Sequence, residues 1–397
     1  MNSAPQPFDK RSALAFVLAF GVVSLFADMA YEGMRGVSGP FLGLLGASGA
    51  AVGLIAGGGE LIGYLLRLLS GRFAERSGAY WPIALSGYAI QMAAVPALAL
   101  AGSWQMAALF IVLERSGKAV RNPAANFMLS RAGAQIGQGW AFGLHEAMDQ
   151  TGACAGPLIA ALVLAHHGDY RSAFLWLGIP AVLTILSVAA LALRFPRAGQ
   201  VVRHASHNAA PPHLSRAFWL YAVAAGLVGF GFADYPLIAF HFAKQTILAE
   251  AWIPAFYALA MGASGAGSLL FGRWFDARGL IVLVPGILMG AVIAPLVFLG
   301  GSKAALAGVI LWGLSLGVHD AVMNAAIANF VPEHLRARAF GLFSALYGIA
   351  WFAGSAVLGL LYDRSRLALV LVAVLAELAA LVPLTLAIRA RQTERRT

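Results

Sequence analysis

Long apolar stretches separated by short polar segments run along nearly the whole chain. About 20 apolar residues are needed to cross a bilayer as an α-helix, and windows of that length identify such spans. The pattern predicts twelve membrane-spanning helices, at residues 12–36, 49–69, 80–101, 105–129, 139–165, 171–194, 217–243, 250–271, 280–300, 304–330, 337–362 and 367–389. Because lipid-facing and lumen-facing residues do not alternate, a membrane β-barrel is disfavoured. We therefore predict an all-α membrane protein.

The two halves of the chain repeat each other. Three short motifs recur at offsets of 201, 198 and 206 residues, namely 71–78 at 272–279, 141–144 at 339–342 and 26–28 at 232–234. Parallel repeats of about half a chain are typical of certain secondary transporters. The repeat predicts two pseudo-symmetric six-helix bundles, residues 1–194 and 217–397, joined by a polar cytoplasmic linker at 195–216.

Composition and charge place the chain in a membrane. Hydrophobic residues make up 60% of it and charged residues 11%, whereas a soluble domain carries about 25% charged residues. Most of the Lys and Arg residues behind the net charge of +10 lie near the two ends and in the loops after even-numbered spans. This positive-inside pattern predicts that both termini are cytoplasmic, and it accounts for the charge without a nucleic-acid partner. The single cysteine, Cys154, excludes an intrachain disulfide.

Fourteen charged side chains nevertheless fall inside the predicted spans. The nine acids are Asp28, Glu32, Glu60, Glu114, Glu146, Asp149, Asp234, Asp320 and Glu377, and the five bases are Arg35, Arg67, Arg115, Lys118 and Arg121. At about 3 kcal/mol for each charge that faces lipid, their exposure would cost on the order of 40 kcal/mol. That exceeds the ~5–15 kcal/mol net stability of a typical fold. The charged groups must therefore pair with one another or line a water-filled cavity.

The candidate site consists of the polar side chains that such a cavity would gather. Asp28, Glu32 and Arg35 share one helix face because they are spaced by four and three residues. We expect the substrate cavity to be lined by Asp28, Glu32, Arg35, Glu60, Arg115, Lys118, Arg121, His145, Asp149, Asp234, His241, Asp320 and Asn324. Alternating wet and dry surroundings switch a carboxyl between its neutral and ionised forms. The expected proton carriers are Asp28, Glu32, Asp149, Asp234 and Asp320.

The bases of the fourth span leave two interpretations of these acids open. Lys118, Arg115 and Arg121 could hold the acids permanently ionised in structural ion pairs. We expect a split in which these bases neutralise most acids and leave Asp28 and Asp149 to titrate. The same bases could hold an anionic solute, but the acids in the same half are equally compatible with a zwitterionic one.

The histidines do not indicate a metal site. His145 and Asp149 are four residues apart, as in half of a helical metal site, but no third ligand is visible. Hydrogen bonds with a structural role are the expected function of His145, His241 and His319. Three further histidines lie in the polar linker, whose flexibility gives poor ligand geometry. We therefore expect neither a metal nor a cofactor.

A family resemblance begins at the repeated segment 71–78. With Glu75 in place of an aspartate, it is similar to the G-x-x-x-D-R-x-G signature between helices two and three of the major facilitator superfamily. Its copy keeps Gly272 and Asp276. The resemblance implies two six-helix bundles around a central cavity that opens alternately to either side of the membrane.

The fifth span adds a second family signature. Gly143, Gly152, Gly156 and Pro157 resemble the antiporter motif G-x(8)-G-x(3)-G-P-x(2)-G-G of the same family. Alanines 160 and 161 replace its last two glycines, and the fourth span lacks the usual R-x-x-x-G arginine. The resemblance implies bending and tight packing of the fifth helix, for which ordinary small-residue packing is an equally good explanation.

The first signature also suggests a gate. A carboxylate at Glu75 can lie at the positive end of a helix from the other half, and Arg336 or Arg338 is its natural partner. We expect this latch to close the cytoplasmic side and stabilise the outward-open state, and the alternative is a turn with a purely topological role. The gate residues are Gly71, Arg72, Glu75, Arg76, Gly78, Gly272, Asp276, Arg278 and Arg338.

The sequence thus predicts a secondary transporter that exports a small organic solute or drug by proton-coupled alternating access. The alternatives are a proton-driven importer or facilitator of an organic anion, and a non-transporting sensor with the same fold. No serine elbow, H-E-x-x-H pair or similar motif indicates an enzyme. The expected partners are a small-molecule substrate, protons and lipid, with no nucleic acid, in a monomer of the bacterial inner membrane.

Overall fold

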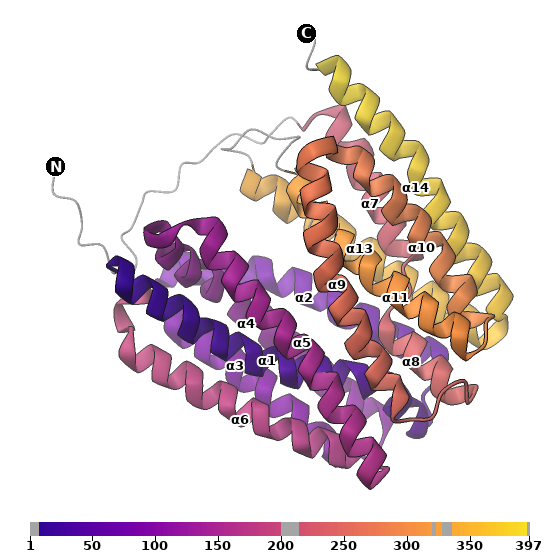
Figure 1. The fold of residues 1–397 in the computed structure, drawn as a ribbon, viewed down its shortest axis with the longest axis horizontal. Helices are drawn as coiled ribbons and strands as arrows, with labels where there is room; N and C mark the ends of the chain where they lie inside the picture. The colour runs from indigo at the N-terminus through magenta and orange to yellow at the C-terminus, as the bar shows by residue number, and fades with distance from the viewer. Residues whose placement is uncertain (1–7, 200–213, 320–322, 328–335, 395–397) are drawn as a thin grey trace. The chain divides into compact units, whose positions relative to one another are not determined.

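The computed structural model describes residues 8–199, 214–319, 323–327 and 336–394, and these residues form α-helices and short 3-10 helices (Figure 1). In the first half the elements are α1 (Lys10–Leu44), α2 (Gly49–Ser77), α3 (Tyr80–Ala97), η1 (Leu98–Leu100), α4 (Trp104–Ile136), α5 (Gln138–His167), α6 (Tyr170–Arg194) and η2 (Pro196–Gly199). In the second half they are α7 (Arg216–Gly231), α8 (Tyr235–Lys244), α9 (Trp252–Arg278), η3 (Gly279–Val282), α10 (Leu283–Phe298), α11 (Ser302–Val318), α12 (Asn324–Ile327), α13 (Arg336–Arg364) and α14 (Arg366–Glu394).

The predicted all-helical membrane fold is confirmed. Each of the twelve predicted spans coincides with one helix or with consecutive helices where the structure describes it, and the tenth span, 304–330, is described at 304–319 and 323–327. Nine helical stretches among the described residues are long and apolar enough to cross a membrane, and Ser302–Val318 is a shorter apolar helix. One of the nine, Trp252–Phe298, joins α9 and α10 through a 3-10 turn. The helix α4 is not among them, and it carries four charged residues near its centre.

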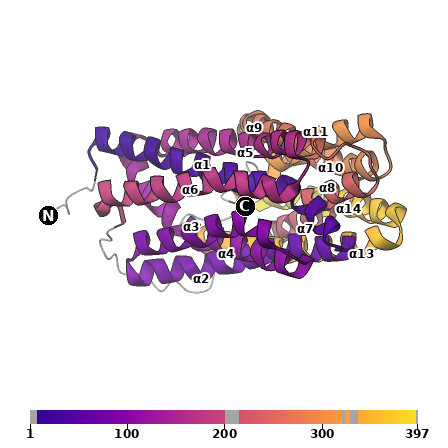
Figure 2. The same cartoon turned by 90° about the horizontal axis from the view of Figure 1, so that it is seen from below.

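The chain divides into two compact units. Unit 1 comprises Met1–Val37 and Ile62–Ala209, and unit 2 comprises Ser38–Leu61 and Ala210–Thr397. The helices α1 and α2 therefore each contribute to both units. Within unit 1, α3 packs against α4 and α6, and α5 packs against α4 and α6. Within unit 2, α9 lies beside α11 (Figure 2), and α14 packs along α7 and α10.

Backbone contacts tie the start of α2 into unit 2. A Cβ on Gly53 would lie 2.3 Å from the carbonyl oxygen of Ser355, so α2 and α13 touch with no side chain between them. The Asp363 carboxylate at the end of α13 accepts hydrogen bonds from the amides of Gly49 and Ala50, at 2.9 and 2.8 Å. A carboxylate is favourable at a helix N-terminus, where the backbone amides lack partners. Asp363 thus caps the first turn of α2.

The repeated signature segments end helices and are not the loops that the sequence suggested. Residues 71–77 are the last turns of α2, and residues 272–278 are the last turns of α9. Each helix ends at a glycine with positive φ, 69° at Gly78 and 66° at Gly279, a conformation that other residues adopt at a cost. Hydropathy falls before these glycines because of charged side chains, but charged side chains are compatible with a helix that continues beyond the bilayer core.

The seventh predicted span is broken in the middle. The helix α7 ends at Gly231, α8 begins at Tyr235, and Asp234 stands at the start of α8. Pro236 in the first turn of α8 explains the break, because proline has no backbone N–H and its ring clashes with the carbonyl four residues earlier, so a helix can begin at this position but cannot run through it. Ala233 lies between the two helices, and its carbonyl accepts a hydrogen bond from Trp312 Nε1 at 2.9 Å. Non-helical backbone within a membrane requires such a partner. The equivalent span of the first half, α1, is unbroken.

The helix α5 lies directly on the backbone of α1. A Cβ on Gly152 would lie 2.1 Å from the carbonyl oxygen of Leu25, and one on Gly156 would lie 2.0 Å from that of Met29. A Cβ on Gly143, in contrast, would meet no atom within 4 Å among the described residues. The predicted antiporter motif thus contains two glycines that permit close helix contact and one in open space.

We predict that Gly156→Ala destabilises the protein, because its methyl group meets backbone atoms that cannot move independently of α1. Overpacking of this kind costs about 1–3 kcal/mol, which should lower the thermal unfolding midpoint of the purified protein in detergent. Gly143→Ala is the matched control on the same helix and should leave the midpoint unchanged or slightly raised. Equal midpoints for the two variants would contradict the α1–α5 contact.

Candidate functional site

The centre of unit 1 holds an acid–base cluster between α1, α4 and α5. Asp28 Oδ1 lies 3.7 Å from Lys118 Nζ and 3.9 Å from Arg121 Nη2, and Asp28 is 5% exposed. The Asp149 carboxyl lies near that of Asp28, and Lys118 is close enough to both carboxyl groups to attract them electrostatically. Asp149 is partly exposed. Four predicted site residues from three separate spans are therefore gathered at one place.

Tyr31 orders the two outer bases of the cluster. Both bases lie over the face of its ring. The ring centre is 3.7 Å from Lys118 Nζ and 4.9 Å from Arg115 Cζ. Arg115 also donates a hydrogen bond to the Tyr31 hydroxyl. Cation–π contacts of this kind contribute about 0.5–2 kcal/mol each, more where water is excluded. Tyr31 thus holds two positive charges one helical turn from Asp28.

A buried glutamine links the inner charges. Gln91 on α3 donates from Nε2 to Glu114 Oε1 at 2.8 Å and accepts at Oε1 from Arg121 Nε at 2.6 Å. The Tyr88 hydroxyl accepts from Arg121 at 3.1 Å. Helices α3 and α4 come close enough for these bonds because Gly117 has no side chain. A Cβ on Gly117 would lie 2.5 Å from the backbone nitrogen of Gln91. The glycine therefore positions the network.

The other predicted residues of the first half lie around this cluster. Glu32 and Arg35 form an ion pair at 4.0 Å, and both are nearly buried. Glu60 is partly exposed and lies in the segment of α2 that belongs to unit 2. His145 Nε2 lies 2.7 Å from Ser24 Oγ and stacks on Phe20, which is the structural hydrogen bond expected for this histidine.

In unit 2 the predicted acid Asp234 sits at the break between α7 and α8. Its Oδ2 accepts hydrogen bonds from Trp351 Nε1 at 2.9 Å and from Ser355 Oγ at 2.8 Å, and Asp234 is 2% exposed. Discontinuous membrane helices are where transporters place substrate and ion sites. Two neutral donors stabilise the carboxyl here, whereas Asp28 has two cations.

The histidines of unit 2 have polar partners, as the sequence suggested. His241 is fully buried and its Nδ1 lies 3.0 Å from the Tyr362 hydroxyl. His319 lies 3.5 Å from Ser315 Oγ, edge-on to Phe232. Among the described residues no group of three or more His, Cys, Asp or Glu side chains could hold a metal ion.

Three predicted residues lie outside what the structure describes. Asp320 falls in an undescribed segment, and the side chains of Asn324 and Arg338 are likewise not described. Their assigned roles stay predictions. The Glu75 side chain is exposed at the end of α2, so its expected latch with Arg338 is untested.

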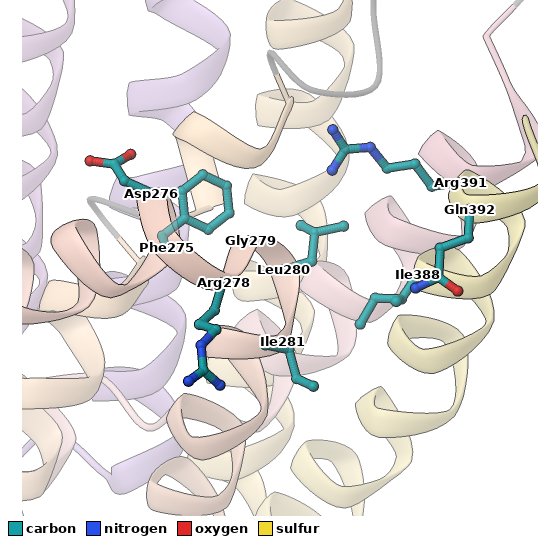
Figure 3. Close-up of a pocket in the computed structure, with 9 residues that line it drawn as sticks. All are labelled: Phe275, Asp276, Arg278, Gly279, Leu280, Ile281, Ile388, Arg391 and Gln392. Carbon is teal, nitrogen blue, oxygen red and sulfur yellow. The ribbon is translucent and has the colours of Figure 1, made fainter. Parts of the chain in front are cut away.

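The second copy of the gate signature lines a cavity of about 540 Å³ in unit 2 (Figure 3). Asp276 and Arg278 come from the end of α9, Gly279 is the first residue of η3, and Arg391 and Gln392 come from the end of α14. Leu280 lies between the two sides, and the Asp276 carboxylate points away from Arg391 (Figure 3). The cavity lies at helix ends, so it is separate from the broken helix that holds Asp234.

Sequence reasoning missed the neutral partners of the charged residues. Tyr31, Tyr88, Gln91, Trp351 and Ser355 all contact site residues directly. A usable signal existed for Gln91, which is the one amide side chain in the span 80–101 and therefore needs a partner inside the membrane. The aromatic residues gave no signal, because tyrosine and tryptophan at helical spacing also occur in plain packing and at membrane interfaces.

Comparison with known proteins agrees with this architecture. Residues 12–355 match the family model described as Major Facilitator Superfamily. The chain is 37% identical over 382 residues to an uncharacterised protein of Mycobacterium tuberculosis, with 94% of this chain and 92% of that protein covered.

Two solved structures share the fold. One is the peptide transporter POT in complex with sulfate, with a TM-score of 0.78, 14% identity, and coverage of 97% of this chain and 99% of that chain. The other is a mutant of the nucleoside transporter NupG, with a TM-score of 0.76, 13% identity, and coverage of 94% and 99%. At these identities the likeness concerns the fold alone.

We predict that Gln91→Leu destabilises unit 1, because it leaves the fully buried Glu114 and the buried Arg121 each short of a hydrogen bond. Unpaired buried polar groups cost about 1–3 kcal/mol, and more when charged. Tyr88→Phe removes a single hydrogen bond and should cost about 0.5–1.5 kcal/mol. Unfolding midpoints measured in one detergent should therefore fall in the order wild type, Tyr88→Phe, Gln91→Leu. The reverse order would contradict the bridging role of Gln91.

Proposed function

The chain belongs to the Major Facilitator Superfamily and is a secondary transporter, and we propose that it exports a small organic solute in exchange for protons. The observation that carries this proposal is the gathering of two carboxyl groups, Asp28 and Asp149, beside Lys118 in the middle of unit 1. A multi-pass chain that is a transporter by family needs a place where solute and proton act on the same groups. The acid–base cluster of unit 1 is that place in our proposal.

The carboxyl pair has the chemistry of a proton site. Two neighbouring carboxyl groups repel each other when both are ionised, so one proton held by the pair relieves that repulsion. Like charges in one site make the two protons leave in separate, coupled steps. Lys118 at 3.7 Å stabilises the singly protonated pair through its positive charge. The pair can therefore lose or gain one proton when its surroundings change.

Exchange follows if the solute and the proton compete for this cluster. A cationic group on the solute would replace the shared proton between Asp28 and Asp149. An anionic group would instead take Lys118 away from Asp28 and raise the proton affinity of the released carboxylate, which couples solute and proton for cotransport and belongs to the alternative function, a proton-driven importer of an organic anion. In both cases binding of one species changes the affinity for the other, which is the thermodynamic requirement for coupling.

The charge balance of the cluster favours a zwitterionic or neutral polar solute. The four acids Asp28, Glu32, Glu114 and Asp149 face the four bases Arg35, Arg115, Lys118 and Arg121. A site with no net charge gives no electrostatic advantage to a net anion. We therefore rank the organic-anion importer second.

Orientation and direction complete the proposal. We place both termini in the cytoplasm, because the basic residues gather at the ends and in the loops after even-numbered spans. Export is favoured by the partial antiporter motif of α5, whose Gly152 and Gly156 hold that helix against α1. The moving bodies of alternating access are the two sequence halves, residues 1–194 and 217–397, in a monomer in the inner membrane.

We predict that an imposed pH gradient drives solute movement in proteoliposomes containing the purified protein. A panel of zwitterions, organic cations, organic anions and drugs should contain a solute whose flux is linked to a proton flux. Asp149→Asn should lose gradient-driven accumulation by roughly tenfold or more, which corresponds to about 1.4 kcal/mol of lost proton-linked free energy. Glu250→Gln, which removes an exposed carboxyl group between α8 and α9, is the control and should behave as wild type.

Two outcomes would overturn parts of this proposal. An unchanged pH-dependent rate in the Asn variants of Asp28, Asp149, Asp234 and Asp320 would remove these residues from proton coupling. A flux of organic anions without counter-transport of protons would support the alternative function.

We also predict that charge at Glu75 controls the gate. Glu75→Arg should reduce transport, because it places a cation beside the basic residues that precede the eleventh span, and the double variant with Arg338→Glu should recover it by restoring an opposite-charge pair. Transport assays of the two single variants and the double variant measure this coupling. Full wild-type transport by Glu75→Gln would mean that the segment is a turn with a topological role only.

A further inference from the structure

Glu377 departs from the rule that membrane-embedded charges pair or face water. It lies in the middle of α14 and is 1% exposed. Neither carboxyl oxygen has a hydrogen-bond partner among the residues that the structure describes. The expectation that every acid in the spans would pair or line a wet cavity is therefore wrong at this position. The surroundings of the Glu377 carboxyl group decide whether it is ionised or protonated there.

Two glycines on neighbouring helices form the slot that holds this carboxyl. A Cβ on Gly290 of α10 would lie 2.6 Å from Oε1 and 2.9 Å from Oε2 of Glu377. A Cβ on Gly231, the last residue of α7, would lie 3.1 Å from its Cγ. The carboxyl group therefore lies flat on the α10 backbone, and its stem passes the end of α7. The space fits the carboxyl group and leaves no room beside the backbone of α10.

Along the described helices that surround this slot, the charged residues lie at the helix ends. The helices packed on α14 are α7, α10 and α13. Described α10 contains no charged residue, α7 has only Arg216 at its start, and the charges of α13 lie at its two ends. On α14 itself, Arg366 and Arg389 are eleven and twelve residues away, which is roughly 16–18 Å along a helix.

Asp234, another buried acid of unit 2, has the hydrogen-bond donors that Glu377 lacks among the described residues. Asp234 lies three residues beyond Gly231, and its carboxyl receives hydrogen bonds from Trp351 and Ser355. These donors can stabilise an ionised carboxyl, and they are held on α13. A bare carboxylate without donors or cations would cost many kcal/mol in a low-dielectric interior, and such a group takes up a proton instead.

We propose that Glu377 is a proton-binding site in which a neutral carboxylic acid is held between Gly231 and Gly290, and that it is a covalent modification site for hydrophobic carbodiimides. The proposal rests on the membrane-embedded fold and not on the solute or the direction of transport. The proton exchanges with water only when α14 separates from α10 and α7. The exchange of the Glu377 proton with water is therefore a measure of this helix separation in unit 2.

The reaction of Glu377 with a carbodiimide requires the carboxyl proton that is held between Gly231 and Gly290. The carboxyl proton moves to one nitrogen of the carbodiimide, and the carboxyl oxygen bonds to the central carbon to give an O-acylisourea. Where water and nucleophiles are absent, the acyl group migrates from oxygen to nitrogen and yields a stable N-acylurea that contains the entire reagent. Where water is present, hydrolysis regenerates the acid. A stable adduct therefore requires a carboxyl group that is both protonated and dry.

The test is labelling of the purified full-length protein with dicyclohexylcarbodiimide, followed by peptide mass mapping. We expect a stable adduct on Glu377 and its loss in Glu377→Gln. A charged, water-soluble carbodiimide should fail to label Glu377 while it reacts at the exposed Glu75 at the end of α2. Asp234→Asn is the matched control in the same unit and should keep the Glu377 adduct. Folded protein that carries no adduct on Glu377, or equal labelling by both reagents, would overturn the proposal.

A double-mutant cycle tests the slot without any reagent. Gly290→Ala should lower the unfolding midpoint in the wild-type background, because its methyl group would overlap the carboxyl group. In the Glu377→Ala background the same change should have no such effect, since the space is empty. Equal effects in the two backgrounds would show that Gly290 does not hold Glu377. A Glu377 adduct in a protein that moves no solute would leave this inference standing and remove the proposed function.

Discussion

The cost of an unpaired charge in an apolar interior is the constraint on which this protein is built. Fourteen charged residues in the spans cannot face lipid without a penalty larger than the stability of the fold. Unit 1 meets the constraint by pairing, since Asp28 lies beside Lys118 and Arg121, and Gln91 satisfies both Glu114 and Arg121. The result is a polar centre with nearly balanced charge inside an apolar helical unit.

Unit 2 meets the same constraint in other ways. Asp234 relies on neutral donors from α13 at a helix break, and Glu377 has no donor among the described residues and lies against two glycines. The three arrangements, an acid beside cations, an acid with neutral donors and an acid in a dry slot, differ in how the entry of water changes the protonation of the acid. A cation-paired acid is already stabilised as an anion, whereas an acid in a dry slot changes its protonation only when the slot opens. A transporter that alternates between wet and dry states can use this difference.

Glycine positions decide where these groups can meet. Gly117 brings α3 against α4 and so places Gln91 between Glu114 and Arg121, and Gly156 brings α5 against α1 beside the Asp28–Asp149 pair. Within a bilayer, association of helices depends on close packing and not on the exclusion of apolar surface from water. The site is therefore supported by residues that carry no chemistry of their own.

The sequence by itself determined the helices, their order, the repeat and the identity of the charged residues, because hydropathy over about 20 residues is a local property. It also indicated that Asp28, Lys118 and Asp149 belong to one site. Only the tertiary structure decided the partners: Tyr31 below two cations, Gln91 as a bridge, and the break that holds Asp234. These depend on which helix faces meet and on where a backbone ends, and both are set by contacts between distant residues that no local pattern encodes.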